Sequence, residues 1–187
     1  MADGYRYRRE GETYCVDLRL RRIEQLFDGR DPAPFRERDL DPHAAEYFTE
    51  AFEDLPRGTP VKMVVDVGEP LPEGIPSSAV GDAIRAYFEF EELRLTRELR
   101  RHVRQAQFAL GMGLGILVVF LSIAEVVTAG GAGHARQVVR EGLVITGWVA
   151  MWRPLEALLY DWWPLFSLRR VKRRIREAPV EVREPTK

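Results

Sequence analysis

The sequence contains very little cysteine and histidine, and this scarcity excludes several classes of protein. Cys15 is the single cysteine among 187 residues, so the chain cannot form an internal disulfide and has no CxxC redox or zinc motif. The three histidines, His43, His102 and His134, have no i,i+4 spacing with one another or with Cys15. Because zinc sites need several such ligands close together, we predict no metal and no cofactor.

Motifs of catalysis and nucleotide binding are absent as well. No GxGxxG follows a strand pattern, and the sequence has neither a Walker phosphate-binding loop nor a GxSxG nucleophile motif. The stretch Gly111–Gly115 resembles a glycine-rich loop in composition alone, because it lies inside a long apolar run. We therefore predict that the protein is not an enzyme. A membrane-bound enzyme that uses acidic residues such as Asp39 and Asp41 stays an alternative.

The net charge of −1 hides a segregation of charge along the chain. Residues 1–93 carry 12 basic and 21 acidic side chains, whereas residues 94–105 carry five arginines and one glutamate. Residues 169–187 carry eight basic and three acidic side chains. An acidic N-terminal part is therefore joined to an apolar part that lies between two basic segments. Basic residues beside an apolar run favour anionic lipid head groups over nucleic acid, so we predict a lipid bilayer as partner and no nucleic-acid partner.

Phe108–Val127 is a 20-residue apolar run whose single charge is Glu125. As a helix it extends about 30 Å, which is the thickness of the hydrocarbon core of a bilayer. A chain of this size is too short to bury such a helix in a soluble core, and the run lies too far from the N-terminus to be a cleaved signal peptide. We predict a transmembrane helix over residues 106–128.

A second apolar stretch, residues 142–166, contains Arg153, Glu156 and Asp161. An arginine near the centre of a span costs roughly 2.5–3.5 kcal/mol, so a re-entrant or surface-lying segment stays an alternative. The basic segments before the first stretch and after the second both belong on the cytoplasmic side by the positive-inside rule, which requires an even number of crossings. We therefore predict two spans of the bacterial inner (plasma) membrane, joined by an external turn at residues 129–141, with both termini cytoplasmic.

A polar group is predicted near the middle of the second span. Arg153 and Glu156 are spaced i,i+3 and can pair on one helix face, next to Pro154. In a symmetrical hairpin, the first span brings small residues to the same depth, and the glycines expected to pack there are Gly111, Gly113 and Gly115. Because two helices cannot shield a charged pair from lipid on every side, we predict a homo-oligomer or a partner membrane protein.

Aromatic and basic residues mark the predicted inner boundary of the second span. Tyr160, Trp162 and Trp163 fall where the helix would leave the membrane, a position that amphipathic rings prefer, and Pro164 would then end the helix. The tail, residues 167–187, is predicted to contact lipid head groups through Arg169, Arg170, Lys172, Arg173 and Arg174.

Residues 1–76 are predicted to form a small α/β head. Thr13–Leu20 alternates apolar and polar residues, as a half-buried strand does, and Pro60–Val67 is a second strand rich in β-branched residues. A helix between them begins with Asp41 as N-cap and Pro42 at its first position. This order predicts a βαβ crossover with parallel strands. Two strands make a poor sheet, so we expect a neighbouring copy, a partner strand or the following helix to complete the layer.

The region between head and membrane, residues 77–105, is predicted to be a stalk helix that continues into the first span, because neither glycine nor proline lies between Asp82 and Phe108. The expected fold class is an α+β membrane protein with a helical hairpin. We predict a non-enzymatic assembly or docking component that is oligomeric through its membrane helices and whose acidic head binds a cytoplasmic protein. The alternative is a small channel or transporter subunit with a path lined by Arg153 and Glu156.

Overall fold

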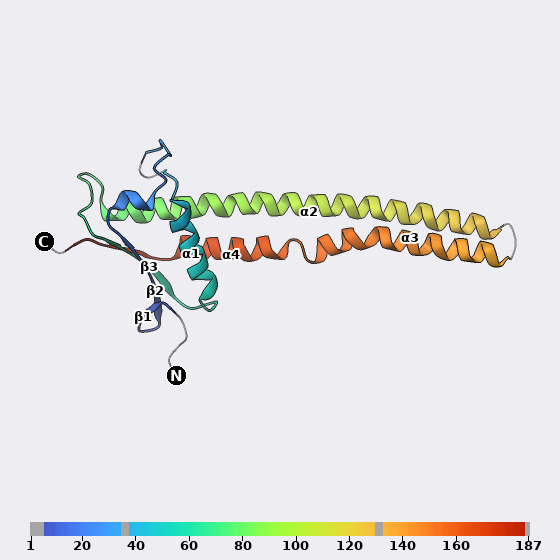
Figure 1. Ribbon diagram of the computed structural model, residues 1–187, viewed down its shortest axis with the longest axis horizontal. Helices are drawn as coiled ribbons and strands as arrows, with labels where there is room; N and C mark the ends of the chain where they lie inside the picture. The colour runs from blue at the N-terminus through green and yellow to red at the C-terminus, as the bar shows by residue number, and fades with distance from the viewer. Residues whose placement is uncertain (1–5, 35–37, 130–132, 186–187) are drawn as a thin grey trace. The chain divides into compact units, whose positions relative to one another are not determined.

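The computed structural model describes residues 6–34, 38–129 and 133–185, and the chain folds into two compact units (Figure 1). The first, which we call the α/β unit, consists of residues 1–94 and 168–187. The second, the hairpin unit, consists of residues 95–167. The fold is mixed α+β, with a small sheet and one long helix, as the sequence predicts.

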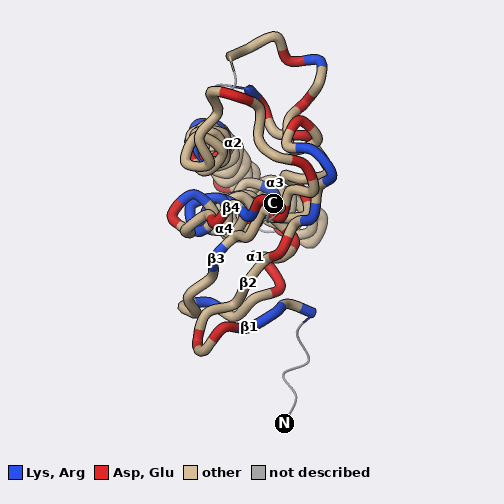
Figure 2. Tube along the Cα trace, turned by 90° about the vertical axis from the view of Figure 1, so that its left-hand side faces the viewer, with Lys and Arg blue, Asp and Glu red and all other residues tan. Residues whose placement is uncertain are grey.

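Four strands form the sheet of the α/β unit, in the order β1-β2-β3-β4 (Figure 2). They are β1 (Arg8–Glu10), β2 (Thr13–Leu20), β3 (Val61–Val67) and β4 (Val180–Arg183). β2 and β3 are parallel, with Val16 opposite Met63, which confirms the predicted βαβ crossover. β1 is antiparallel to β2, and β4 is parallel to β3.

The chain completes this sheet by itself, which differs from the expectation that a neighbouring copy, a partner strand or a helix does so. β4 comes from residues 167–187, which the sequence pattern assigned to a basic tail. It pairs Val180 with Met63 and Val182 with Val65, and both valines pack against the core. The sequence signal was weak because a strand of four residues after a basic run is too short to show clear alternation.

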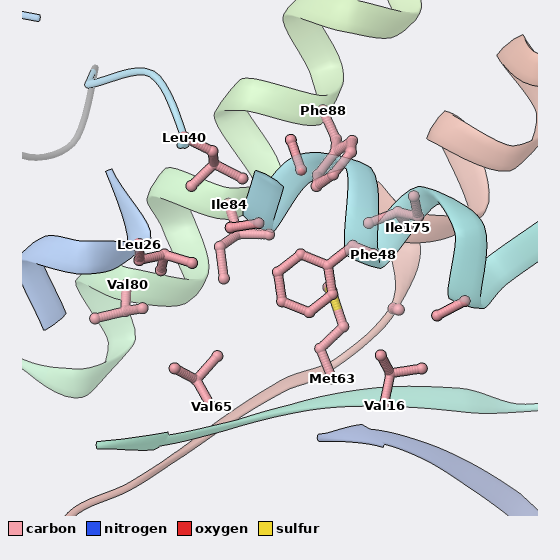
Figure 3. Packing of buried hydrophobic residues seen from close by; sticks show 14 of the residues in the cluster. Val16, Leu26, Leu40, Phe48, Met63, Val65, Val80, Ile84, Phe88 and Ile175 are labelled. Atoms are coloured by element: carbon pink, nitrogen blue, oxygen red, sulfur yellow. The ribbon is translucent and has the colours of Figure 1, made fainter. Parts of the chain in front are cut away.

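Helices cover one face of the sheet in the α/β unit (Figure 3). They are η1 (Ile23–Leu26), α1 (Pro42–Asp54), the first turns of α2 (Ser77–Ala129) and the later turns of α4 (Trp163–Glu177). Phe48 of α1, Phe88 of α2 and Ile175 of α4 are fully buried and pack in one cluster with Met63 and Val65 of β3. Each such burial stabilises the fold by about 1.5–3 kcal/mol, so α4 is part of the core of this unit.

Asp41 begins helix α1 as predicted. Its Oδ1 accepts hydrogen bonds from the backbone N–H groups of His43, at 2.9 Å, and Ala44, at 3.3 Å. Pro42 lies in the first turn, where its missing N–H costs no hydrogen bond. The Asp41 carboxylate therefore serves to cap a helix.

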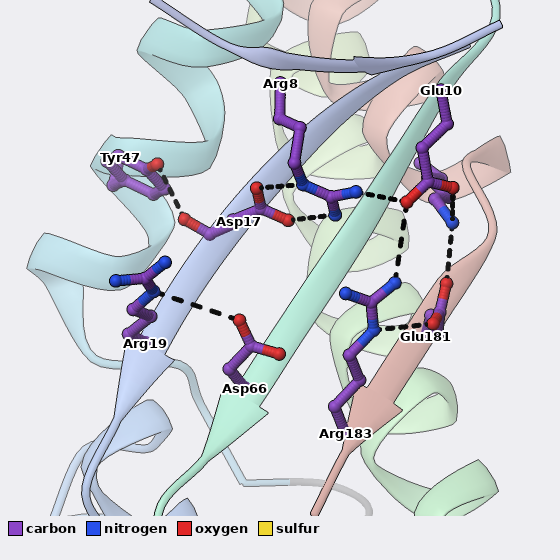
Figure 4. A network of polar contacts seen from close by, with 9 residues as sticks. Arg8, Glu10, Asp17, Arg19, Tyr47, Asp66, Glu181 and Arg183 are labelled. Atoms are coloured by element: carbon purple, nitrogen blue, oxygen red, sulfur yellow. Dashed lines mark hydrogen bonds and ion pairs between the residues drawn. The ribbon is translucent and has the colours of Figure 1, made fainter.

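The other face of the sheet carries a network of charged side chains (Figure 4). Arg8 donates to both carboxylate oxygens of Asp17, at 2.9 and 2.7 Å, and it also pairs with Glu10. Lys62 Nζ lies 2.6 Å from Glu10 Oε2 and 2.7 Å from Glu181 Oε2, which links β3 to β1 and to β4. Lys62 and then Arg8 lower the pKa of Glu10 to about 2. These charges neutralise one another within the unit.

Two residues that the sequence assigned to lipid head groups instead attach α4 to α1. Lys172 is 8% exposed, and its ammonium donates a 2.8 Å hydrogen bond to Thr49 Oγ1. The half-buried guanidinium of Arg174 lies 2.9–3.4 Å from four backbone carbonyl oxygens near the end of α1, those of Phe52, Leu55, Pro56 and Thr59. Because both side chains turn into the α/β unit, we withdraw the lipid contact for Lys172 and Arg174.

The remaining basic residues of α4 lie at or near its surface. Arg176 Nη1 lies 3.0 Å from Glu92 Oε2 of α2, and Arg169 Nε lies 3.7 Å from Glu92 Oε1. Glu92 is 8% exposed, so these contacts hold a largely buried carboxylate. Arg170 and Arg173 are exposed. A lipid contact stays a prediction for Arg169, Arg170 and Arg173.

In the hairpin unit, helix α2 runs on to Ala129 and α3 (His134–Leu159) returns beside it (Figure 1). The continuity of the predicted stalk with the first apolar run is confirmed. Among the described residues, α2 is the one helix that is long and apolar enough to cross a membrane, with an 18-residue window of mean hydropathy 2.3.

The boundaries of the second helix differ from those expected. α3 begins at His134, inside the stretch predicted as an external turn, and it ends at Leu159. α4 then begins at Trp163, so Pro164 lies in the first turn of a helix and does not end one. Proline is tolerated there because the first N–H groups of a helix have no partner within it.

Arg174→Lys should destabilise the α/β unit by about 2–4 kcal/mol, because one ammonium cannot replace a planar group that donates to four carbonyls. The measurement is amide hydrogen exchange of β3 in the full chain in mild detergent. The matched control is Arg173→Lys, in which an exposed neighbour keeps its charge, and it should leave the exchange unchanged. Equal protection in both variants would contradict the structural role of Arg174.

Lys172→Met should change how the stability of the α/β unit depends on pH. Burial lowers the pKa of Lys172 in the folded chain below its usual 10.5. Between the folded and the unfolded pKa, the unfolded chain binds more protons than the folded chain, so the wild-type unfolding free energy should rise with pH relative to that of the variant. Subtracting the variant's unfolding free energy from that of the wild type at each pH removes the contribution of the tyrosines, which both chains share. Parallel pH profiles, measured by hydrogen exchange of β3, would show that Lys172 is not desolvated.

Candidate functional site

The charged residues of the second apolar stretch gather around one guanidinium. Arg153 Nη1 donates to Glu156 Oε2 at 3.1 Å, which is the predicted i,i+3 pair. Arg153 Nη2 also lies 3.8 Å from Asp161 Oδ2, an ion pair that the sequence spacing did not suggest. Asp161 reaches it from the turn between α3 and α4. The Arg153 side chain is 74% exposed, so the cluster lies on the surface of the hairpin unit.

One of the three predicted packing glycines contacts α3. A Cβ atom at Gly113 would lie 3.3 Å from Met151 Sδ and from Pro154 Cγ, so only glycine allows this approach without a shift. Cβ atoms at Gly111 and Gly115 would meet nothing within 4 Å among the described residues. These two glycines are therefore on the outside of the hairpin unit.

A second close contact, which the sequence analysis missed, involves Gly147 of α3. A Cβ atom there would lie 2.8 Å from Leu117 Cδ1 and 3.5 Å from Phe120 Cβ. The buried positions of α2 after Leu95 are Ala106, Gly113, Leu117 and Ala124, which are separated by seven, four and seven residues. This spacing is typical of a helix that packs along one face, and it is the signal in the sequence that could have revealed the seam.

These contacts set the register of the hairpin and place Arg153 closer to the basic end than expected. With Gly113 beside Met151 and Gly147 beside Leu117, Arg153 lies level with about Gly111. That is about 5 Å from the level of Phe108, where the apolar run begins. The register therefore differs from the symmetrical one expected from the sequence, in which Gly115 lies level with Pro154, because α3 begins at His134 and the link between the helices is shorter than assumed.

A groove of about 570 Å³ opens along the hairpin unit beside this cluster. Its walls are small because α2 and α3 present alanine and glycine there, among them Ala109, Gly113 and Ala157. The polar lining residues are His102, Gln105, Arg153 and Asp161. His102, Gln105 and Asp161 lie at the end nearest the basic segment, and Arg153 directs its guanidinium toward Asp161 at that end. The groove therefore has apolar walls and charged residues at one end, an arrangement that suits an amphipathic ligand.

A hollow next to this mouth is lined by arginines of α2, which are Arg97, Arg100, Arg101 and Arg104, and it shares Gln105 with the groove. Residues 94–105 hold five arginines and one glutamate, so the surface beside the mouth is basic. The mouth itself holds Arg153 and its ion-pair partner Asp161.

The predicted aromatic anchors lie at the turn that follows α3. Tyr160 and Trp163 are exposed, whereas Trp162 lines the groove. The rings of Trp162 and Trp163 meet edge to face with centroids 5.8 Å apart, and Trp162 meets Phe166 in the same way at 5.7 Å. The turn therefore carries a compact aromatic group.

No group of three or more histidine, cysteine or carboxylate side chains is placed to hold a metal ion within residues 6–34, 38–129 and 133–185. Comparison with protein-family models, with curated proteins and with solved structures finds no match to this chain.

The double variant Phe120→Cys/Gly147→Cys should form an intramolecular disulfide on mild oxidation. The two Cβ positions lie 3.5 Å apart, within the range that a disulfide requires. The assay is gel mobility with and without reductant in a Cys15→Ser background, since Cys15 is the one native cysteine. The pair Ser122→Cys/Gly147→Cys matches the symmetrical hairpin expected from sequence and should stay reduced. The opposite result would restore that register.

Proposed function

We propose that the protein is a non-enzymatic assembly component whose hairpin unit crosses the inner membrane twice. The observation that carries this proposal is the extent of exposed apolar surface on both helices of the hairpin unit. Phe108 and Val126 of α2 are each 74% exposed, and Trp152 of α3 is 73% exposed. Contiguous apolar surface of this kind is unfavourable in water and favourable in a bilayer.

The chain connectivity supports two crossings over one. The α/β unit contains residues from before the hairpin and residues from after it, and β3 pairs directly with β4. The hairpin must therefore leave and return on the same side. The basic segment at residues 94–105 makes that side cytoplasmic by the positive-inside rule. At about 5 Å inside the apolar run, Arg153 can extend its guanidinium to the head groups.

Self-association is proposed to involve the outer face of α2. Gly115 precedes Leu117 by two residues, which turns it about 200° around the helix from the seam with α3. Gly111 and Gly115 thus form a GxxxG pair on the far face, where a second helix can approach closely. The hairpin unit would then pair with a second copy, and the acidic α/β unit would bind a cytoplasmic partner.

The channel alternative has less support. A path for ions or solutes needs polar groups along the whole thickness of the membrane. Arg153, Glu156 and Asp161 gather at one end of the hairpin unit. Residues 113–124 and 142–152 contain no charged side chain.

Gly115→Leu should weaken self-association in vesicles by about tenfold or more, because a leucine there prevents close approach of two helices. The measurement is energy transfer between donor- and acceptor-labelled chains at several protein-to-lipid ratios. The matched control is Gly142→Leu, which adds the same side chain to an open position on α3. A monomeric wild type at every ratio would contradict the proposed oligomer, and equal loss in both variants would exclude this face.

A further inference from the structure

We propose that the groove of the hairpin unit binds one anionic phospholipid of the cytoplasmic leaflet. Its acyl chain would occupy the apolar walls, and its phosphate would lie at the basic mouth. The inference rests on the proposed membrane location of the hairpin and adds a specific ligand to it. All the lining residues belong to the hairpin unit, so the site is complete within residues 95–167.

The dimensions of the groove fit an acyl chain. The apolar part extends from the level of Phe108 to Ile116 and Ala150, which is about 12 Å along the helix axis. Half of a hydrocarbon core is about 15 Å thick. The groove therefore begins where the apolar run begins and ends close to the middle of the bilayer, as a chain anchored in one leaflet does.

The groove is open because of the small side chains on its walls. Ala106 and Ala109 on α2 and Ala150 and Ala157 on α3 line the groove with methyl groups. In a bilayer an open apolar groove is filled by lipid chains or by another helix. Beside the groove, α2 and α3 are in direct contact at Gly113 and Met151. The groove therefore opens to the side of the hairpin unit, where neighbouring lipid can enter it directly.

The charges beside the mouth favour a negative head group. His102, Gln105, Arg153 and the Asp161 carboxylate line the mouth, and Arg101 and Arg104 line the adjoining hollow, where no acidic side chain lies among its lining residues. Arg153 uses Nη1 for Glu156, whereas its Nη2 lies 3.8 Å from Asp161, beyond hydrogen-bond distance. Phosphate is a preferred partner of arginine because its oxygens match the planar guanidinium.

Trp162 supports the assignment of the mouth to the head-group level. It lines the groove at the same end as His102, beside the exposed rings of Tyr160 and Trp163. Tryptophan and tyrosine prefer the membrane–water interface. An anionic lipid is therefore favoured over a zwitterionic one, because the arginines supply positive charge at the depth where the two head groups differ.

The test uses the full chain reconstituted in vesicles of equimolar phosphatidylglycerol and phosphatidylcholine, extracted in mild detergent and examined by native mass spectrometry. We expect about one retained phospholipid per chain, with phosphatidylglycerol preferred by about tenfold. Ala109→Phe should abolish retention because the ring fills the groove. Val118→Phe, which adds the same ring to the opposite face of α2, should retain lipid as the wild type does.

The charge of the mouth is tested separately. Arg101→Gln/Arg104→Gln should bring the preference close to equality while keeping retention, and Arg136→Gln/Arg140→Gln at the other end of the hairpin should leave the preference unchanged. Formation of the Phe120→Cys/Gly147→Cys disulfide in the Ala109→Phe background shows that the hairpin is still folded.

Three results would overturn the inference: equal retention of both lipids by the wild type, unchanged retention in Ala109→Phe, or disulfide-linked dimers of Ala109→Cys, which would assign the groove to a second copy. Failure of the chain to float with vesicles would instead contradict the proposed membrane location. The two proposals can therefore fail separately.

Discussion

β3 and β4 are paired in the sheet although the two helices of the hairpin unit lie between them in the sequence. Met63 pairs with Val180, and the whole hairpin unit lies between these two residues in the sequence. The chain must therefore leave the α/β unit and return to it. The buried Ile175, Lys172 and Arg174 of α4 strengthen this closure with apolar packing and hydrogen bonds. Both ends of the apolar hairpin are therefore held by one folded unit.

The two basic segments have different roles although their compositions are alike. On α4, two of the cations point inward, because backbone carbonyls at the end of α1 and the Thr49 hydroxyl need donors in a half-buried setting. On α2, Arg97, Arg101 and Arg104 stay at the surface around a hollow. A basic run beside an apolar stretch therefore stays at the surface only where no acceptor in the protein competes for it.

The position of the polar cluster follows from helix packing. Close approach at Gly113 and Gly147 aligns α2 and α3, and this alignment moves Arg153 toward the basic end of the hairpin. A guanidinium near the boundary needs less shielding than one at the centre, because its charge reaches the head groups. The Arg153–Glu156 pair therefore no longer requires self-association. The outward-facing Gly111 and Gly115, which allow a second helix to approach closely, are the observation that favours it.

The features that depend on local pattern can be predicted from the sequence: the long α2 helix, the Asp41 cap and the Arg153–Glu156 pair. They follow from spacing within a few residues or from a continuous apolar run, and the parallel pairing of β2 and β3 follows from the order strand, helix, strand. Three features depend on the folded chain: β4 completes the sheet, Arg174 caps α1, and Gly113 faces α3 while Gly115 does not. These features join residues that are far apart in the chain, and their partners are set by packing geometry, which one-dimensional spacing does not contain.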